Sequence, residues 1–193
     1  MLAGVMPFAE AILDSRTLIL EELQRSVSSV DSAALHEAKK AVLAAESIFT
    51  AGAGRSRLSL MMAAMRLMHL GLRVHVAGET TTPAIKADDL LIIASGSGTT
   101  VSALAAASVA KKVGAKVLAI TTAAASPLGV IADHLLVVQA AGKQEHGGTI
   151  SRQYAGSLFE QSVLLLVDSL FDTMWRERGE SAEELWKRHA NLE

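Results

Sequence analysis

An apolar run that ends in a loop of glycine and hydroxyl residues constrains this chain more than any other stretch. Residues 90–94 read Leu-Leu-Ile-Ile-Ala, and residues 95–100 read Ser-Gly-Ser-Gly-Thr-Thr. The run is too short and too continuously apolar for an amphipathic helix, so it predicts a strand buried on both faces of a parallel sheet. Helical spacing begins at Thr99 and lasts to Val113, where Gly114 follows. The stretch therefore predicts a strand, a loop and a helix in that order.

The composition of this loop predicts a phosphate site. Glycines let the backbone approach a ligand, hydroxyls donate hydrogen bonds, and the free N–H groups at the start of the helix attract an anion. The loop lacks the Gly-Lys-Ser/Thr ending of a nucleoside triphosphate site, so it suits a single phosphate monoester such as a sugar phosphate. The alternative is a helix cap with nothing bound. The candidate phosphate-binding residues are Ser95, Gly96, Ser97, Gly98, Thr99 and Thr100.

The rest of the chain alternates between strand-like and helix-like stretches. Two helices, over about 5–27 and 31–46, precede the first strand, and a long helix follows a polar loop at 142–148. The alternation predicts an α/β fold, a three-layer α-β-α sandwich with a five-stranded parallel sheet of flavodoxin-like type. The strands are expected at 47–51, 74–77, 90–94, 116–121 and 134–138. We expect one domain over 1–193, with N-terminal helices at 1–46, the sheet core at 47–139, and a loop and C-terminal helices at 140–193.

A second glycine loop, Gly52-Ala53-Gly54-Arg55-Ser56, follows the first expected strand. Because the carboxyl ends of parallel strands share one edge, both loops are expected to line one pocket. Gly52 and Gly54 allow close approach, Ser56 supplies a hydroxyl at a helix start, and Arg55 either holds the substrate or is simply solvated. A dinucleotide site with Glu79 as the ribose acceptor is disfavoured, because Arg57 stands where the third glycine belongs.

Composition excludes several classes of protein. A net charge of −2 argues against nucleic acid or an anionic membrane as the main partner. The absence of Cys excludes disulfides and thiolate chemistry, and no His/Asp/Glu cluster has metal-ligand spacing. The first residues do not resemble a signal peptide, and no apolar run reaches the roughly 18 residues of a membrane span. We expect a cytoplasmic protein without metal or cofactor.

Five segments together resemble a known family, the sugar isomerase (SIS) domain. They are the two glycine loops, Met-Arg-Leu-Met-His-Leu-Gly at 65–71, Gly-Glu-Thr at 78–80, and Gly-Ser-Leu-Phe-Glu-Gln at 156–161. Within that family they are most similar to the 6-phospho-3-hexuloisomerases. The resemblance implies a tetramer that converts 3-hexulose 6-phosphate to fructose 6-phosphate without a metal, in the ribulose monophosphate route of formaldehyde fixation. Alternatives are an SIS isomerase for a pentose or heptose phosphate, and a non-catalytic sugar-phosphate sensor.

The sequence departs from the family pattern at a few positions. Arg57 stands where Gly is usual, Thr99 where Glu is common, and Tyr154 where a proline is often found. His146-Gly147-Gly148 replaces a more polar stretch. These differences bear on substrate preference and loop geometry more than on the fold.

Glu160 and His69 are the candidate catalytic residues. Moving a carbonyl to the adjacent carbon through an enediolate requires a base, which a single carboxylate such as Glu160 supplies. The alternative for Glu160 is a capping box with Ser157. His69 ends a helix that runs roughly 20 Å away from the carboxyl edge, so it could act only in a neighbouring subunit, polarising the carbonyl or assisting ring opening. The alternative for His69 is a purely structural role.

A homo-oligomer is expected, because the leading helix and the broad apolar face of the late helix exceed what one sheet covers. The other histidines that we considered are interpreted as strand-end or loop residues: His75, His134 and His146.

Overall fold

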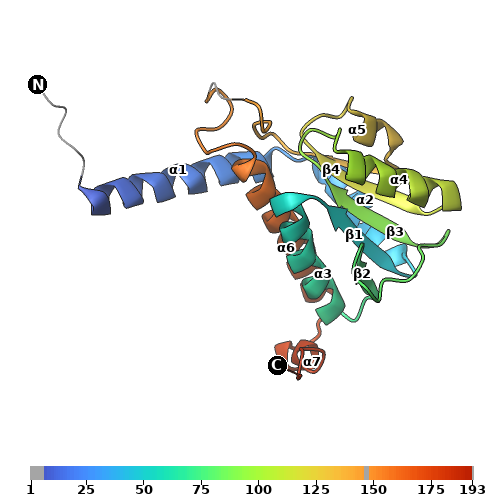
Figure 1. Cartoon of the computed structure of the whole chain (residues 1–193). Coiled ribbons are helices and arrows are strands. Elements are labelled where there is room, and N and C mark those ends of the chain that lie inside the picture. The colour runs from blue at the N-terminus through green and yellow to red at the C-terminus, as the bar shows by residue number, and fades with distance from the viewer. Residues whose placement is uncertain (1–6, 146–147, 193) are drawn as a thin grey trace, which may run out of the picture.

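The computed structural model describes residues 7–145 and 148–192. Its centre is a sheet of five parallel strands in the order β2-β1-β3-β4-β5 (Figure 1). The strands are β1 (Ile48–Gly52), β2 (Val74–Val76), β3 (Leu90–Ala94), β4 (Lys116–Thr121) and β5 (His134–Val137). The helices are α1 (Phe8–Ser28), α2 (Ser32–Ala44), α3 (Gly54–His69), α4 (Val101–Val113), α5 (Pro127–Ile131), α6 (Ser157–Arg178) and α7 (Ala182–Trp186).

The sheet separates two hydrophobic cores, which confirms the predicted three-layer architecture. Along the fully buried β3, Leu90 and Ile92 pack with side chains of α2, α3 and α6, whereas Leu91 and Ile93 pack with α4 and α5. Successive side chains of a strand point to opposite faces, so a continuous apolar run is needed when both faces are covered. The apolar run at 90–94 therefore marks the middle strand of the sheet.

Several helix ends follow the sequence signals directly. Asp31 caps α2 by accepting a hydrogen bond from the Ala34 N–H at 2.8 Å, and Ser181 accepts one from the Glu184 N–H at 3.3 Å. Gly71 and Gly114 adopt left-handed φ values of 81° and 87° just beyond α3 and α4. These local signals correctly predict where those helices begin or end.

Other boundaries differ from the expected ones. α4 begins at Val101 rather than Thr99, because Thr100 has extended backbone angles and serves as the N-cap. α3 already begins at Gly54, so Arg55 and Ser56 belong to its first turn rather than to a loop. The expected helix over 31–46 ends at Ala44, and residues 5 and 6 of the expected leading helix lie outside the described residues.

Helix α1 projects from the body of the molecule (Figure 1). Its C-terminal half packs on α6, where Glu22 and Ser26 are buried, while Phe8 and Ile12 at its other end are 80% and 51% exposed. Among the described residues, no helix is both long and apolar enough to cross a membrane.

Candidate active site

The two predicted glycine loops lie side by side at the carboxyl edge of the sheet, here called the rim. β1 and β3 are neighbours, with Gly52 in register with Ala94, so the segments that follow them leave the sheet at the same place. The strand order reverses between these two strands, and ligands of open parallel sheets bind at such a switch point. The expectation that both loops share one edge is confirmed.

The loop over 95–100, here called the hydroxyl loop, offers two exposed hydroxyls. Ser97 Oγ accepts hydrogen bonds from the Thr99 N–H and hydroxyl at 3.2 and 2.9 Å, and both residues are exposed. Ser95 differs, because its buried Oγ shares a hydrogen bond of 2.9 Å with Thr100 Oγ1. The hydroxyls of Ser97 and Thr99 are therefore accessible to a ligand, whereas that of Ser95 secures the loop.

Backbone contacts hold the hydroxyl loop in place. Gly98 has φ of +63°, and a Cβ there would lie 1.9 Å from Ser126 Oγ, so only glycine fits. The Gly96 carbonyl accepts hydrogen bonds from Thr121 Oγ1 at 3.0 Å and from the Thr122 N–H at 3.1 Å. The loop therefore has a fixed shape before any ligand arrives.

The turn after β1 is tighter than the sequence indicated. Gly54 has φ of +56°, and a Cβ on Gly52 would lie 3.1 Å from the Arg57 backbone nitrogen. Two glycines thus allow the chain to turn directly from strand to helix. Arg55 is exposed at the rim, whereas Ser56 is only 4% exposed.

An ion pair joins Arg55 to Glu160. Arg55 Nε lies 2.7 Å from Glu160 Oε2, and the glutamate side chain is 9% exposed against 61% for the arginine. α3 and α6 are also joined at this point by Ser59, whose hydroxyl donates to the Glu160 carbonyl oxygen at 2.8 Å. The structure thus brings together two of the candidate residues, which the sequence places in separate segments.

The capping-box interpretation of Glu160 is wrong. Gly156, not Ser157, is the N-cap of α6, and no side chain caps that helix end. Ser157 is itself the first helical residue, so the Glu160 side chain is free of capping and pairs with Arg55 instead.

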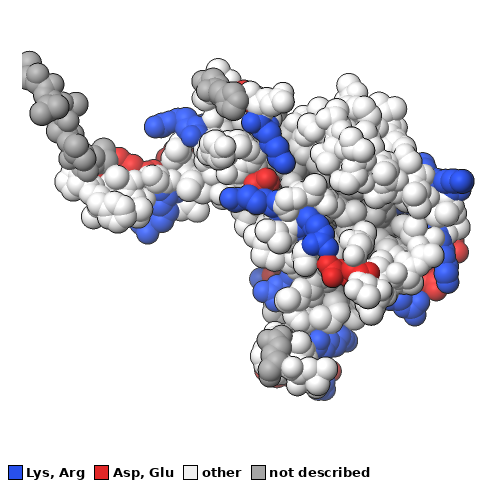
Figure 2. All heavy atoms as spheres, in the orientation of Figure 1, with Lys and Arg blue, Asp and Glu red and all other residues white. Residues whose placement is uncertain are grey.

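The start of α6 lies against both the hydroxyl loop and the loop that precedes α6. A Cβ on Gly96 would lie 3.4 Å from the Phe159 ring, next to Glu160 in the chain. A Cβ on Gly156 would lie 3.4 Å from Lys143 Cγ and 3.7 Å from Glu160 Oε1. The Lys143 side chain and the Glu160 carboxylate therefore both lie close to Gly156. Figure 2 shows that basic side chains gather on this face around the start of α3, which favours an anionic ligand.

Helix α1 anchors the segment that leads into α6. The buried Glu22 carboxylate accepts hydrogen bonds from Ser151 Oγ at 2.6 Å, the Arg152 N–H at 2.8 Å and Gln153 Nε2 at 3.1 Å. Burial alone raises the pKa of Glu22, but these hydrogen bonds and the charge of Arg25 lower it overall. Glu22 therefore holds residues 151–153 as an ionised carboxylate.

The chain then turns sharply into α6. Tyr154 is 87% exposed, and Ala155 has φ of 51°. A left-handed alanine is unfavourable, so the Glu22 contacts before it and the helix after it must hold this conformation.

A pocket of about 350 Å³ lies beside Glu160. It is lined by Arg55, Leu58, Ser59, Met62, Glu160, Gln161 and Leu164. The Gln161 Oε1 atom is buried and has no hydrogen-bond partner among the described residues.

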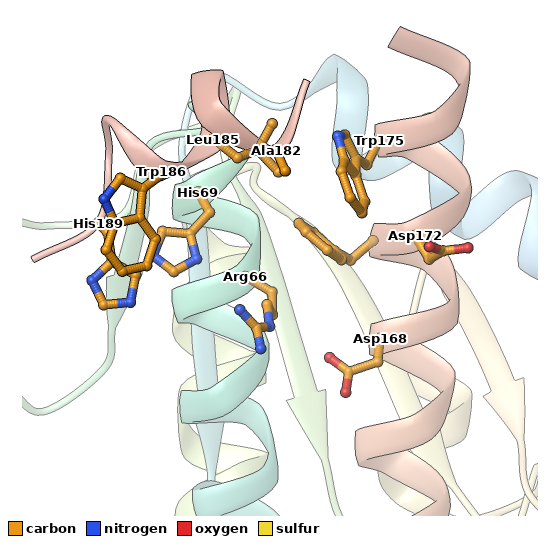
Figure 3. Close-up of a pocket in the computed structure, with 10 residues that line it drawn as sticks. Arg66, His69, Asp168, Asp172, Trp175, Ala182, Leu185, Trp186 and His189 are labelled. Carbon is orange, nitrogen blue, oxygen red and sulfur yellow. The ribbon is translucent and has the colours of Figure 1, made fainter. Parts of the chain in front are cut away.

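His69 lies at the opposite end of α3, as the helix length predicts. It is 5% exposed and lines a pocket of about 480 Å³ between the ends of α3 and α6 and the C-terminal residues (Figure 3). Burial lowers the pKa of His69, and the positive charges of His189 and Arg66 lower it further. The rim and this pocket are therefore two separate places on the chain.

The other residues considered from the sequence lie outside the site or outside the described residues. The carboxylate of Glu79, once considered as a ribose acceptor, pairs with Arg57. His75 packs on the Phe49 ring at 5.0 Å, His134 begins β5, and His146 lies outside the described residues. Within 7–145 and 148–192, no three His, Asp or Glu side chains are placed to hold a metal ion.

Sequence reasoning missed Glu22, Lys143 and the C-terminal residues around His69. Glu22 gave no signal beyond a charge within a helix, and the other residues lie in a loop and a tail whose positions no periodicity predicts.

Comparisons with known proteins agree with this geometry. Residues 42–165 match the SIS domain family. The chain is 50% identical over 190 residues to the 3-hexulose-6-phosphate isomerase of Mycobacterium gastri, covering 98% of this chain and 96% of the relative. It is 38% identical to the 3-hexulose-6-phosphate isomerase of Bacillus subtilis, covering 91% and 95%.

A solved structure supports the same relationship. A protein of Methanococcus jannaschii, whose structure infers a molecular function of 3-hexulose-6-phosphate isomerase, has a TM-score of 0.78 at 29% identity, covering 93% of this chain and 99% of that one. The chain belongs to the SIS domain family and is similar over nearly its full length to 3-hexulose-6-phosphate isomerases.

Proposed function

We propose that this chain is an isomerase that interconverts 3-hexulose 6-phosphate and fructose 6-phosphate, in the ribulose monophosphate route of formaldehyde fixation. The close relatives carry that activity in their names, and the chain aligns with them almost from end to end. The observation that carries the chemistry is the Glu160 carboxylate, which lies where the hydroxyl loop, the first turn of α3 and the start of α6 meet.

The Glu160 carboxylate is the proton-transfer group in this proposal. It removes the proton from C2 of the hexulose, the electron pair forms the C2–C3 double bond, and the C3 carbonyl oxygen becomes the enediolate oxygen. A proton then moves from the C2 hydroxyl to that oxygen, and protonation of C3 leaves the carbonyl at C2. Arg55 fixes the carboxylate through its Nε at 2.7 Å and supplies positive charge beside it.

The phosphate group is proposed to bind at the rim. Ser97 and Thr99 offer exposed hydroxyls, and the first turns of α3 and α4 offer free N–H groups. Gly52, Gly54, Gly96 and Gly98 let the ligand approach the backbone, while Ser56, Ser95 and Thr100 shape the loops behind it.

His69 is proposed to act in the site of a neighbouring subunit, with its neutral imidazole polarising the carbonyl. This requires a homo-oligomer, for which we propose a tetramer built from chains that each form one domain over 1–193. The exposed apolar side chains of the projecting α1, among them Phe8, Leu13 and Leu20, support such an assembly, because water is a poor solvent for them. Light scattering at micromolar concentration tests this point, and a monomer would contradict the role of His69.

The experiment that tests the function supplies the purified protein with 3-hexulose 6-phosphate and follows fructose 6-phosphate through a coupled assay. We expect turnover, and in D₂O we expect deuterium at C3 of the fructose 6-phosphate and at C2 of the recovered 3-hexulose 6-phosphate. No turnover with the hexulose but turnover with a pentose or heptose phosphate would identify a different isomerase. Tight binding of sugar phosphates without any turnover would instead identify a sensor.

A further inference from the structure

The far end of α3 is closed by residues from the C-terminus of the chain. The last carbonyls of a helix have no partner within it, and here two arginines supply the donors. Arg188 Nη1 donates to the His69 carbonyl oxygen at 2.9 Å, and Arg178 Nη1 donates to that of Leu70 at 2.6 Å. Glu180 holds Arg188 in turn, with Oε2 at 2.9 Å from Arg188 Nη1. The backbone at His69 is thus fixed from outside the helix.

The imidazole of His69 is fixed by a stack of rings. Its centroid lies 5.1 Å from that of His189, with an interplanar angle of 16°. Trp186 in turn stacks on His189, with the ring centroids 4.4 Å apart and an interplanar angle of 23°. Figure 3 shows the three rings lying together beside the end of α3. Since His69 is buried and Trp186 is 69% exposed, the stack leads from the pocket wall to the surface.

Charged groups from α3, α6 and the C-terminal segment lie around this pocket. Arg66 lies one turn before His69 on α3, and Arg188 and His189 come from the C-terminal segment. Figure 3 shows Asp168 of α6 pointing toward Arg66, whereas the carboxylate of Asp172 points away from the pocket. Asp172 is paired with Arg176 at 2.6 Å. Burial and the neighbouring cationic groups both lower the pKa of His69, because both favour its neutral imidazole.

We propose that Trp186, Arg188 and His189, here called the C-terminal clasp, are positioning residues for His69. The clasp holds the imidazole in one orientation, so that the ring is presented to the carbonyl of the substrate in a neighbouring subunit. This inference rests on the function proposed for His69 above. It assigns a role in the reaction to a segment outside residues 42–165, which match the SIS family.

The test compares two replacements of His189 with a control inside the same segment. His189→Ala removes the stacked ring, and His189→Phe keeps a ring of similar area. Lys187→Ala is the control, because Lys187 is exposed and its ammonium pairs only with Glu184 among the described residues. We expect His189→Ala to lower kcat by about tenfold with KM within about twofold, and His189→Phe to restore most of kcat.

A pH profile separates positioning from loss of fold. Activity requires neutral His69, so it falls as pH falls through the pKa of that group. In His189→Ala, the loss of burial and of the neighbouring charge lets the His69 pKa rise, so the acid limb moves to higher pH. A lower fraction of folded protein would reduce kcat without moving this limb.

Two further variants, His69→Asn and Trp186→Leu, distinguish failure of the role proposed for His69 from failure of the clasp inference. If His69→Asn keeps normal turnover, the role proposed for His69 is wrong, while the isomerase assignment stands. If His69→Asn loses turnover but His189→Ala and Trp186→Leu both match the Lys187→Ala control in kcat and pH profile, the clasp inference is overturned. Trp186 is exposed, so Trp186→Leu tests the stack even where His189→Ala does not fold, and we expect a smaller change in the same direction.

Discussion

The two ends of the α3–α6 helix pair are constructed differently. At the rim, the hydroxyl loop and the first turn of α3 follow directly from β3 and β1, which are neighbours in the sheet. At the far end, His69 is enclosed by the C-terminal clasp, and the contact between Arg188 and His69 spans 119 positions of sequence. Chain topology therefore places these two rim segments, whereas individual side-chain contacts hold His69. Changes at the rim are expected to act directly on binding and proton transfer.

The largest effect is expected from Glu160→Gln. The amide keeps the shape and an oxygen that accepts from Arg55, but it is no base at neutral pH. We expect kcat to fall by about 10²-fold or more with little change in KM. Steady-state kinetics and deuterium exchange in D₂O measure the two consequences separately.

Glu177→Gln is the matched control on the same helix, since this carboxylate pairs with Lys39 at the surface. Normal turnover and normal deuterium exchange in Glu160→Gln would exclude the Glu160 carboxylate as the base. His69 from a neighbouring subunit would then become the leading candidate, and the contrast between the two ends would be reversed.

A smaller effect is expected from Arg55→Gln. Without the guanidinium, the Glu160 carboxylate loses its 2.7 Å partner and its fixed orientation. We expect kcat to fall by about tenfold, because a misplaced base transfers protons less efficiently. Arg73→Gln serves as the control, because its ion pair with Glu46 is exposed on both sides. An unchanged kcat in Arg55→Gln would mean that packing alone positions Glu160.

Within the hydroxyl loop, Ser97 and Ser95 are expected to behave differently. Ser97→Ala removes an exposed hydroxyl and should raise KM by about tenfold, which corresponds to about 1.4 kcal/mol for a hydrogen bond to a charged phosphate. Ser95→Ala removes the buried partner of Thr100 and should mainly lower the free energy of unfolding, by about 1 kcal/mol. Steady-state kinetics and urea denaturation of both variants show whether Ser97 acts mainly on substrate binding and Ser95 mainly on stability.

Much of the rim was predictable from sequence because its signals are local. The apolar run at 90–94, the glycines after β1 and β3, and the cap at Asp31 each lie within a few residues of what they specify. The pairing of Arg55 with Glu160 was not predictable, because it depends on how α6 packs on α3. The start of α6 was misjudged for a local reason, since Ser157 matches a capping pattern although Gly156 occupies the cap.

Near the rim, Glu22 makes long-range contacts comparable to those that the C-terminal clasp makes at the far end. Glu22 holds Ser151, 129 positions away, and so supports the start of α6 from outside the sheet. If topology alone places the rim, losing this carboxylate should hardly disturb catalysis. We expect Glu22→Gln to lower kcat by only about twofold, while the free energy of unfolding at pH 7 falls by about 1–2 kcal/mol.

The pH dependence of Glu22→Gln identifies the cause of that loss. The pKa of Glu22 is lowered in the folded protein from its usual 4.5, so the ionised carboxylate stabilises the fold above about pH 4.5. That contribution is lost as pH falls through the folded pKa. The stability difference between wild type and Glu22→Gln, measured by urea denaturation, should therefore be constant near neutrality and shrink in acid.

The neighbouring Glu21 is exposed, so Glu21→Gln is the control and should show no such difference. Equal stability of the two variants at pH 7 would contradict the anchoring role of Glu22, whereas a loss of kcat as large as that of Arg55→Gln would show that the rim, like the far end, depends on a distant contact.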